Sequence, residues 1–164
     1  MVAAAHDLRG ALAGIDLVSF VKTTGGKGIH VVVPIERRSE WPEVKAFARS
    51  FAEELAAKEP GRFLTRISIA ERRGKIFIDY LRNDPTSTAV APYSTRSRAG
   101  APVSTPLAWE ELTPSLDPSS FTLRTVPGRL AELADDPWAG IAKIRQKLPR
   151  AAASDKSVRP RRRA

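Results

Sequence analysis

The chain has 164 residues, a formal net charge of +9 and no cysteine, and its length suits one domain with a core of its own. The lack of cysteine excludes disulfides and cysteine-ligated zinc, and it is typical of a cytosolic protein. No apolar run is long enough to cross a membrane, and the N-terminus lacks the basic and apolar regions of a secretory signal.

The positive charge is concentrated at the C-terminal end. Of the 27 basic and 18 acidic residues, nine basic and one acidic residue follow from Lys143 onward, which leaves 18 basic and 17 acidic residues before it. After Pro149 the chain is mainly Ala, Ser, Arg and Pro. We therefore predict a domain over residues 1–149 and a disordered basic tail over residues 150–164, which would attract nucleic acid nonspecifically or remain a solvated end.

A helix and two strands are predicted first along the chain. Apolar residues recur at helical spacing over residues 3–15, and apolar strands follow over residues 18–22 and 29–33. The glycine-rich loop between the strands exposes backbone N–H groups beside a hydroxyl, a lysine and a histidine, which favours a polyphosphate site. Its candidate phosphate-binding residues are Thr24, Gly25, Gly26, Lys27 and His30.

The loop is not a P-loop, because a strand follows it, whereas the P-loop of nucleotide-binding proteins leads into a helix. Two plainer interpretations of the loop and of His30 remain open. Glycines between two strands are also typical of a tight hairpin that needs positive φ angles. A histidine within an apolar strand, such as His30, is more often a hydrogen-bonded core residue than a ligand.

An amphipathic helix is predicted after the second strand. Ser39 offers an N-cap, Pro42 suits the first turn, and the helix ends before Pro60. The apolar stripe from Trp41 to Leu55 is expected to be core.

The clearest strand lies over residues 75–81, ahead of a turn at Asp84. Period-two alternation places Asp79 on the same face as Phe77, where an ionised carboxylate needs a cation or hydrogen bonds. Arg82, Arg96 or a metal ion would meet this need. The alternative is a partly exposed aspartate at a strand end, ion-paired with Arg82.

The remainder of the chain is less regular. A strand is possible over residues 88–93, an ordered proline-rich loop around Trp109 is expected over residues 99–118, and helices are expected over residues 127–133 and 139–148. The fold class is therefore α/β (α+β), a mixed sheet with flanking helices. Residues 62–98 hold eight basic and three acidic residues, so they form either a polyanion site or a solvated basic rim.

Several segments in fixed order resemble the polymerase domain of bacterial ATP-dependent DNA ligase D, a member of the archaeo-eukaryotic primase superfamily. The similarity extends over about residues 3–148. The segments that carry it are residues 18–34, 75–83, 88–96, 102–107 and 136–138. Asp-x-Asp, the first motif of that family, does not occur in this sequence. The resemblance therefore implies the C-terminal portion of a primase-type polymerase domain, beginning after that motif.

The resemblance implies a function in DNA double-strand break repair by end joining. Such domains fill gaps and add untemplated nucleotides with Mn2+ or Mg2+. Asp79 would be the third metal-binding carboxylate, and Thr24, Lys27 and His30 would hold the nucleotide triphosphate. Arg72, Arg82 and Arg96 would serve the phosphates and the active-site charge network.

The implied partners are DNA ends, gapped DNA, nucleoside triphosphates, a Ku-type end-binding protein and a ligase module. A monomer in the cytoplasm, associated with the nucleoid, is expected.

Asp79 alone cannot fix two hard cations, each of which needs several oxygen ligands. We therefore expect these residues to be inactive on their own. Two alternatives are a noncatalytic nucleotide- or DNA-binding remnant and a chain that completes an enzyme in trans.

Overall fold

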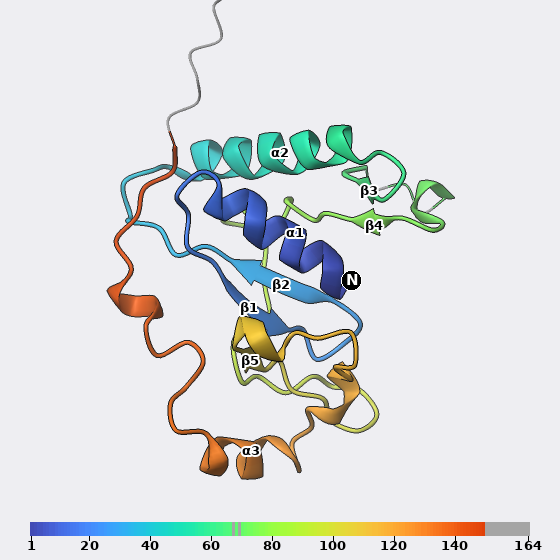
Figure 1. Ribbon diagram of the computed structural model, residues 1–164, viewed down its shortest axis with the longest axis vertical. Helices are drawn as coiled ribbons and strands as arrows, with labels where there is room; N and C mark the ends of the chain where they lie inside the picture. Colours follow the sequence, from blue (N-terminus) through green and yellow to red (C-terminus); the bar gives the residue numbers. More distant parts are fainter. Residues whose placement is uncertain (67, 69, 150–164) are drawn as a thin grey trace, which may run out of the picture.

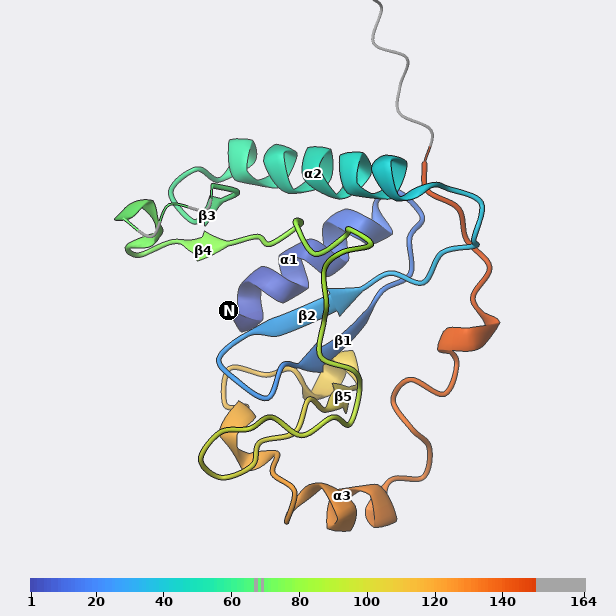
Figure 2. The same cartoon turned by 180° about the vertical axis from the view of Figure 1, so that it is seen from behind.

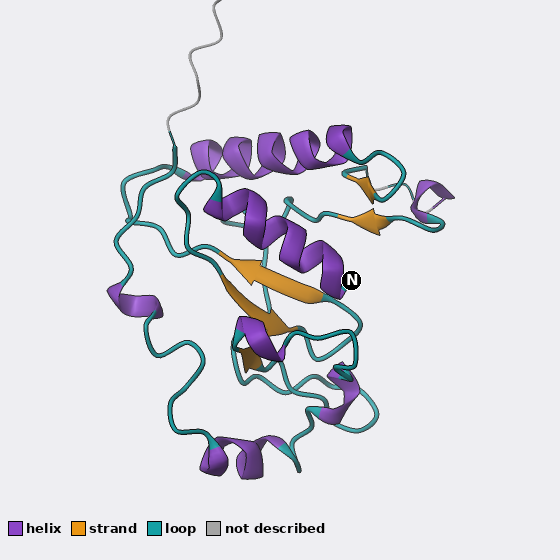
Figure 3. Ribbon diagram, viewed as in Figure 1, coloured by secondary structure: helices purple, strands orange, loops and turns teal. Residues whose placement is uncertain are grey.

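The computed structural model describes residues 1–66, 68 and 70–149, and the predicted basic tail over residues 150–164 lies outside them (Figure 1). The helices and strands occupy a modest part of the chain, and loops and short 3-10 turns connect them (Figure 3). The helices are α1 (Val2–Ala13), α2 (Trp41–Lys58) and α3 (Val126–Glu132). The strands are β1 (Phe20–Thr23), β2 (Ile29–Val32), β3 (Phe63–Leu64), β4 (Ile76–Phe77) and β5 (Pro106–Leu107).

Strand pairing is divided between two small sheets. The first is antiparallel with the order β2-β1-β5, and its register pairs Lys22 with His30 and Val21 with Leu107. The second is the parallel pair β3-β4. Helix α1 lies across one face of the first sheet, and the chain that follows β4 crosses the opposite face (Figures 1 and 2). The first sheet is therefore covered by α1 on one face and by the chain after β4 on the other, and β2 is one of its edge strands.

The main core lies between α1, β1 and the loops around β5. Val21 is fully buried in the centre of the sheet, and Trp109 donates its indole N–H to the Ser19 carbonyl at 2.8 Å. The buried members of this cluster are Ala5, Val21, Val103, Leu107, Trp109, Leu112, Phe121 and Val126. In the described residues, no helix is long and apolar enough to span a membrane.

The predicted α/β class, the first two strands and the helices now labelled α1, α2 and α3 are confirmed. The predicted N-cap of α2 at Ser39 is wrong, because Glu40 is the N-cap and its backbone N–H donates to the Glu43 carboxylate at 3.0 Å. The apolar stripe of α2 is only partly core. Trp41 is 52% exposed, and the buried residues of the helix are Ala52 and Leu55.

The strand predicted over residues 75–81 is too long, because β4 ends at Phe77. Backbone pairing continues to Ile78, whose N–H donates to the Leu64 carbonyl at 2.9 Å. Asp79 then accepts the Leu81 N–H at 3.1 Å, an Asx-type bond that turns the chain out of the strand. After Ile78, a local bond to the Asp79 side chain therefore replaces the backbone hydrogen bonds expected for a strand over residues 79–81.

The strand predicted over residues 88–93 and the helix predicted over residues 139–148 are also wrong. Residues 139–148 hold only a 3-10 turn at Ile141–Lys143, followed by chain without regular secondary structure. There the Gln146 amide donates to the carbonyls of Val18 and Pro34 and accepts the Val18 N–H. These long-range bonds favour an irregular segment over a helix.

The proline-rich loop over residues 99–118 is ordered around Trp109 as predicted, but it also contains β5, which sequence reasoning missed. Pro106 is compatible with β5 because this strand lies at the sheet edge.

Candidate functional site

The glycine-rich loop forms the tight hairpin between β1 and β2. The backbone N–H and the hydroxyl of Thr24 both donate to the Gly28 carbonyl, at 3.2 and 3.0 Å. Gly25 has a φ of +62°, a conformation that side chains other than glycine rarely adopt. The hairpin interpretation of the loop is therefore correct locally, and a phosphate-binding role would be an addition to it.

Two arginines lie against this hairpin. A Cβ atom placed on Gly25 would lie 2.7 Å from Arg96 Cγ and 3.2 Å from the Pro102 carbonyl oxygen. A Cβ atom on Gly26 would lie 3.1 Å from a terminal nitrogen of Arg98. The absence of side chains at these glycines thus lets two guanidinium-bearing residues approach the loop. Arg98 was not among the predicted site residues, although the spacing Arg-Ser-Arg was a signal for it.

Beside the hairpin lies a cavity of about 680 Å³, enclosed by α1, β2 and residues 76–96. Its apolar side comes from α1, β2 and β4, including Leu8, Ile29 and Phe77. Its polar side is formed by the side chains of Thr24, His30, Asp79, Arg82, Asn83 and Arg96. Five predicted site residues, from three separate segments of the chain, therefore converge on one cavity.

Asp79 and Arg82 form an ion pair in the wall of this cavity. Arg82 Nε lies 3.1 Å from an Asp79 oxygen, and another Arg82 nitrogen donates to the Thr88 carbonyl at 2.8 Å. The turn that carries them is fixed to α2, because Lys45 Nζ lies 2.7 Å from the Asp84 carboxylate. Hydrogen bonds from Lys45 and Thr86 hold the pKa of Asp84 well below its usual range. The alternative of an aspartate at a strand end, paired with Arg82, thus describes the geometry of Asp79.

His30 is neutral at physiological pH in this environment. Burial lowers its pKa to about 4, and the nearby charges of Lys22, Arg82 and Arg96 act in the same direction, whereas Asp79 opposes them. A neutral imidazole has one N–H donor and one acceptor nitrogen. His30 can therefore hydrogen-bond an anion without carrying a charge of its own.

Lys22 is a buried cation that sequence reasoning missed. The residue is 3% exposed, and its ammonium donates to the Val90 carbonyl at 2.8 Å and to Ser104 Oγ at 2.6 Å. Burial and the Arg96 charge lower its pKa to about 8. Strand alternation was the available signal, since Lys22 pairs with His30 across the hairpin and shares its face.

The other predicted residues lie outside the cavity wall. Lys27 is exposed on the hairpin, and Gly25 and Gly26 lie against the two arginines. The Arg72 guanidinium lies 4.1 Å from the centre of the Phe77 ring. Phe77 lines the cavity and Arg72 does not, so Arg72 contacts the cavity wall from behind.

The described residues do not fit a two-metal centre. No group of three or more His, Asp or Glu side chains among residues 1–66, 68 and 70–149 is placed to hold a metal ion. Asp79 is the one carboxylate among the described residues that line the cavity, and it is already paired with Arg82.

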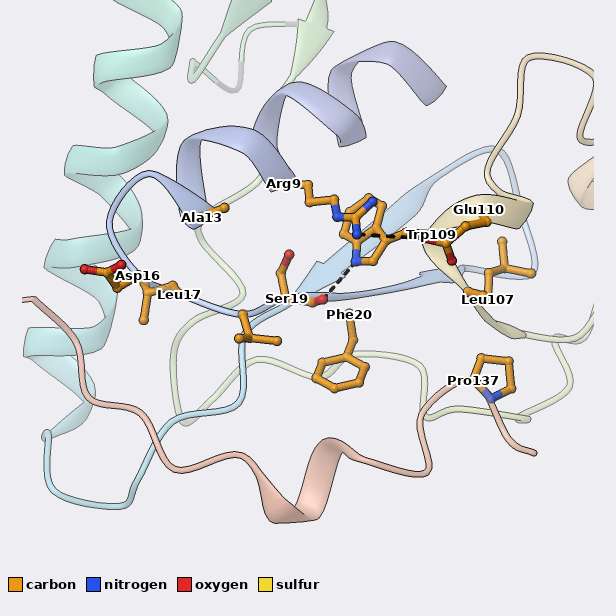
Figure 4. A pocket seen from close by; sticks show the side chains of 12 residues that line it. Arg9, Ala13, Asp16, Leu17, Ser19, Phe20, Leu107, Trp109, Glu110 and Pro137 are labelled. Atoms are coloured by element: carbon orange, nitrogen blue, oxygen red, sulfur yellow. Dashed lines mark hydrogen bonds and ion pairs between the residues drawn. The ribbon is translucent and has the colours of Figure 1, made fainter.

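A second hollow of about 600 Å³ lies between α1, the start of β1 and the turn after β5 (Figure 4). Trp109 closes one side of it through its bond to Ser19, and Arg9 lies over the indole ring at 5.0 Å. None of the predicted phosphate-binding residues lines this hollow. The cavity beside the glycine hairpin is therefore the candidate site.

Comparison with known proteins agrees with the motifs. The family described as "LigD, primase-polymerase domain" matches residues 1–138. The chain belongs to the LigD primase-polymerase family. It is 48% identical over 135 residues to the multifunctional non-homologous end joining protein LigD of Pseudomonas aeruginosa. The matched region covers 82% of this chain and 16% of that protein.

More distant LigD proteins give the same result. The bifunctional non-homologous end joining protein LigD of Bacillus subtilis is 34% identical over 130 residues. This matched region covers 79% of this chain and 21% of that protein. Among solved structures, the polymerase domain of Mycobacterium tuberculosis ligase D in complex with DNA matches with a TM-score of 0.77 and 32% identity. That match covers 86% of this chain and 48% of the solved domain. The chain thus spans about half of a LigD polymerase domain and a smaller share of the whole LigD proteins.

Replacing Gly25 by alanine tests the contact between the hairpin and Arg96. We expect Gly25→Ala to lower the free energy of unfolding by about 2–4 kcal/mol, because it combines a positive φ with a clash. Gly100 is a matched control, since its φ is +80° and a Cβ there meets nothing within 4 Å. Gly100→Ala should cost only the left-handed backbone strain, about 1–2 kcal/mol. Equal losses for the two variants in urea unfolding would show that the Arg96 contact contributes nothing.

Proposed function

We propose that this chain is the phosphate-binding portion of a LigD nucleotidyltransferase domain and that its cavity binds the triphosphate of a nucleoside triphosphate. The observation that carries the proposal is the convergence of His30, Arg82 and Arg96 beside Thr24. Guanidinium groups offer paired N–H donors that match phosphate oxygens, and a neutral imidazole adds a further donor. The exposed Lys27 and the Gly25-Gly26 backbone extend these donors along the hairpin.

Each residue has a distinct part in this proposal. Arg96, seated on Gly25, and Arg82, held by Asp79, present charge to the phosphates, and His30 donates a hydrogen bond between them. Arg72, stacked on Phe77, supports the cavity wall from outside. Asp79 would be the chain's contribution to binding Mn2+ or Mg2+, which would neutralise developing phosphate charge in a complete site.

The same proposal includes DNA as the second substrate. The Mycobacterium tuberculosis polymerase domain is described as a complex with DNA. For this chain we propose DNA ends or gapped DNA, with a Ku-type protein and a ligase module as functional partners. We also propose that the chain is a monomer at the nucleoid in the cytoplasm.

Arg96→Met tests nucleotide binding at the cavity. We expect its affinity for ATP, measured by calorimetry at low salt without metal, to fall about tenfold because a bidentate phosphate contact is lost. Arg49→Met is the matched control, since Arg49 is exposed on α2 and paired with Glu53. The control should bind ATP as the unchanged chain does. If the unchanged chain fails to bind ATP, or if both variants bind equally well, the proposal is wrong.

A second candidate is a noncatalytic nucleotide- or DNA-binding module. The lack of a metal-ligand cluster in the described residues favours it for these 164 residues taken alone. Both candidates bind ATP, but only the enzyme forms a phosphodiester bond.

Primer extension separates the two candidates. With gapped DNA, Mn2+ and ribonucleotides, we expect no primer extension by these 164 residues. Asp79 supplies a single carboxylate, whereas two cations need several oxygen ligands. The polymerase domain of Mycobacterium tuberculosis ligase D serves as the positive control. Robust extension by this chain that disappears in Asp79→Ala would instead establish that it is an enzyme by itself.

A further inference from the structure

The segment that carries Arg96 over the cavity, residues 88–96, is here called the strap. It follows the turn at Asp84 and crosses the sheet on the face opposite α1 (Figure 2). Its second half is held by backbone bonds: the Tyr93 N–H donates to the Ser104 carbonyl at 2.6 Å and the Arg96 N–H to the Pro102 carbonyl at 2.8 Å. The first half, residues 88–92, lines the cavity through Thr88, Ala89 and Val90.

The first half of the strap is held by side-chain cations. Thr88, Ala89 and Val90 make no backbone–backbone hydrogen bond with any other described residue. Instead, Arg82 donates to the Thr88 carbonyl at 2.8 Å, and Lys22 donates to the Val90 carbonyl at 2.8 Å. Two cations from separate segments therefore fix alternate carbonyls of one short stretch of chain.

Lys22 also holds the second half of the strap. Its ammonium donates to Ser104 Oγ at 2.6 Å, and that hydroxyl donates in turn to the Thr23 carbonyl at 2.8 Å. Ser104 is the residue whose backbone carbonyl accepts the Tyr93 N–H and whose N–H donates to Ser94. A single buried ammonium thus joins β1 to both halves of the strap.

The position of Lys22 is electrostatically costly without an anion. No carboxylate among the described residues lies within ion-pair distance of its ammonium. Arg96 on the strap and His30 on β2 face it, and Arg82 and Asp79 flank His30. Burying a charge is tolerated when hydrogen bonds and an opposite charge compensate. A polyphosphate in the cavity would supply that opposite charge to Lys22 and to both arginines together.

We propose that Lys22 is a positioning residue of the triphosphate site: its buried ammonium fixes the strap so that Arg96 and the Thr88–Val90 wall face the bound phosphates. This inference rests on the proposed function, because it assigns Lys22 to the same nucleotide site. Lys22 acts through the strap and through its charge beneath the cavity, whereas Lys27 lies on the exposed hairpin.

Lys22→Met, which keeps most of the length and the apolar character of the stem but removes the ammonium, tests the proposal. We expect its ATP affinity at pH 7.5 to fall about tenfold. We also expect faster amide exchange in the free protein at Tyr93 and Ser104, whose N–H groups are hydrogen-bonded between the strap and the Ser104 segment that Lys22 holds. Lys58→Met is the control, since Lys58 is exposed at the end of α2 and paired with Glu54. It should match the unchanged chain in both measurements.

A pH profile separates a charge effect from a merely structural one. The lowered pKa of Lys22, about 8, predicts that the ammonium of the free protein loses its proton between pH 7.5 and 9. ATP affinity of the unchanged chain should therefore fall severalfold over that range, and the affinity of Lys22→Met should stay constant. Ser104→Ala is the second variant. Ser104→Ala removes the hydroxyl that Lys22 bonds, so amide exchange in the strap should become faster. It keeps the Lys22 ammonium, so the pH dependence of ATP affinity should be preserved.

The outcomes distinguish this inference from the proposed function. If the unchanged chain binds no ATP, the proposed function fails, and the triphosphate role of Lys22 fails with it. If the unchanged chain binds ATP but Lys22→Met has the same affinity, or the same amide exchange at Tyr93 and Ser104, only the assignment of Lys22 is overturned. A pH dependence that persists in Lys22→Met would likewise overturn it.

Discussion

An excess of positive charge around one cavity is the constraint on which the rest of the site depends. Lys22, Arg82 and Arg96 converge there, and Asp79 is the only carboxylate among the described residues of the wall. Burial and this field together keep His30 neutral and lower the pKa of Lys22. Such an arrangement is stabilised when an anion enters, because its negative charge offsets the excess positive charge of all three cations at once. The geometry of the cavity therefore supports the ligand class that we propose, a polyphosphate.

Local sequence patterns predicted the parts of the molecule that local physics determines. The glycines between two apolar strands fix the β1–β2 hairpin, and Gly25 has the positive φ that such a turn requires. Helical spacing of apolar residues located α1, α2 and α3. The motif residues His30, Arg82 and Arg96 meet in one cavity, and their phosphate-binding role stays a prediction.

Long-range side-chain bonds account for what the sequence did not predict. Gln146 holds the chain after the last 3-10 turn against the sheet by bonding to backbone groups near β1 and β2, which no helical pattern reveals. Asp79 ends a strand early by bonding to Leu81, and residues 88–92 take their partners from Arg82 and Lys22. Lys22 itself looked like an ordinary strand residue, because its burial depends on the strap that covers it.

The most direct test of the anion cavity is the pKa of His30, followed by nuclear magnetic resonance with and without ATP. The chain has two histidines, and His6 is an internal control because its ring bonds to the Leu112 carbonyl and does not line the cavity. A triphosphate beside His30 should raise its pKa from about 4, since a nearby negative charge favours the protonated imidazole, and the His6 signals should not change. An unchanged His30 pKa at saturating ATP would contradict the account.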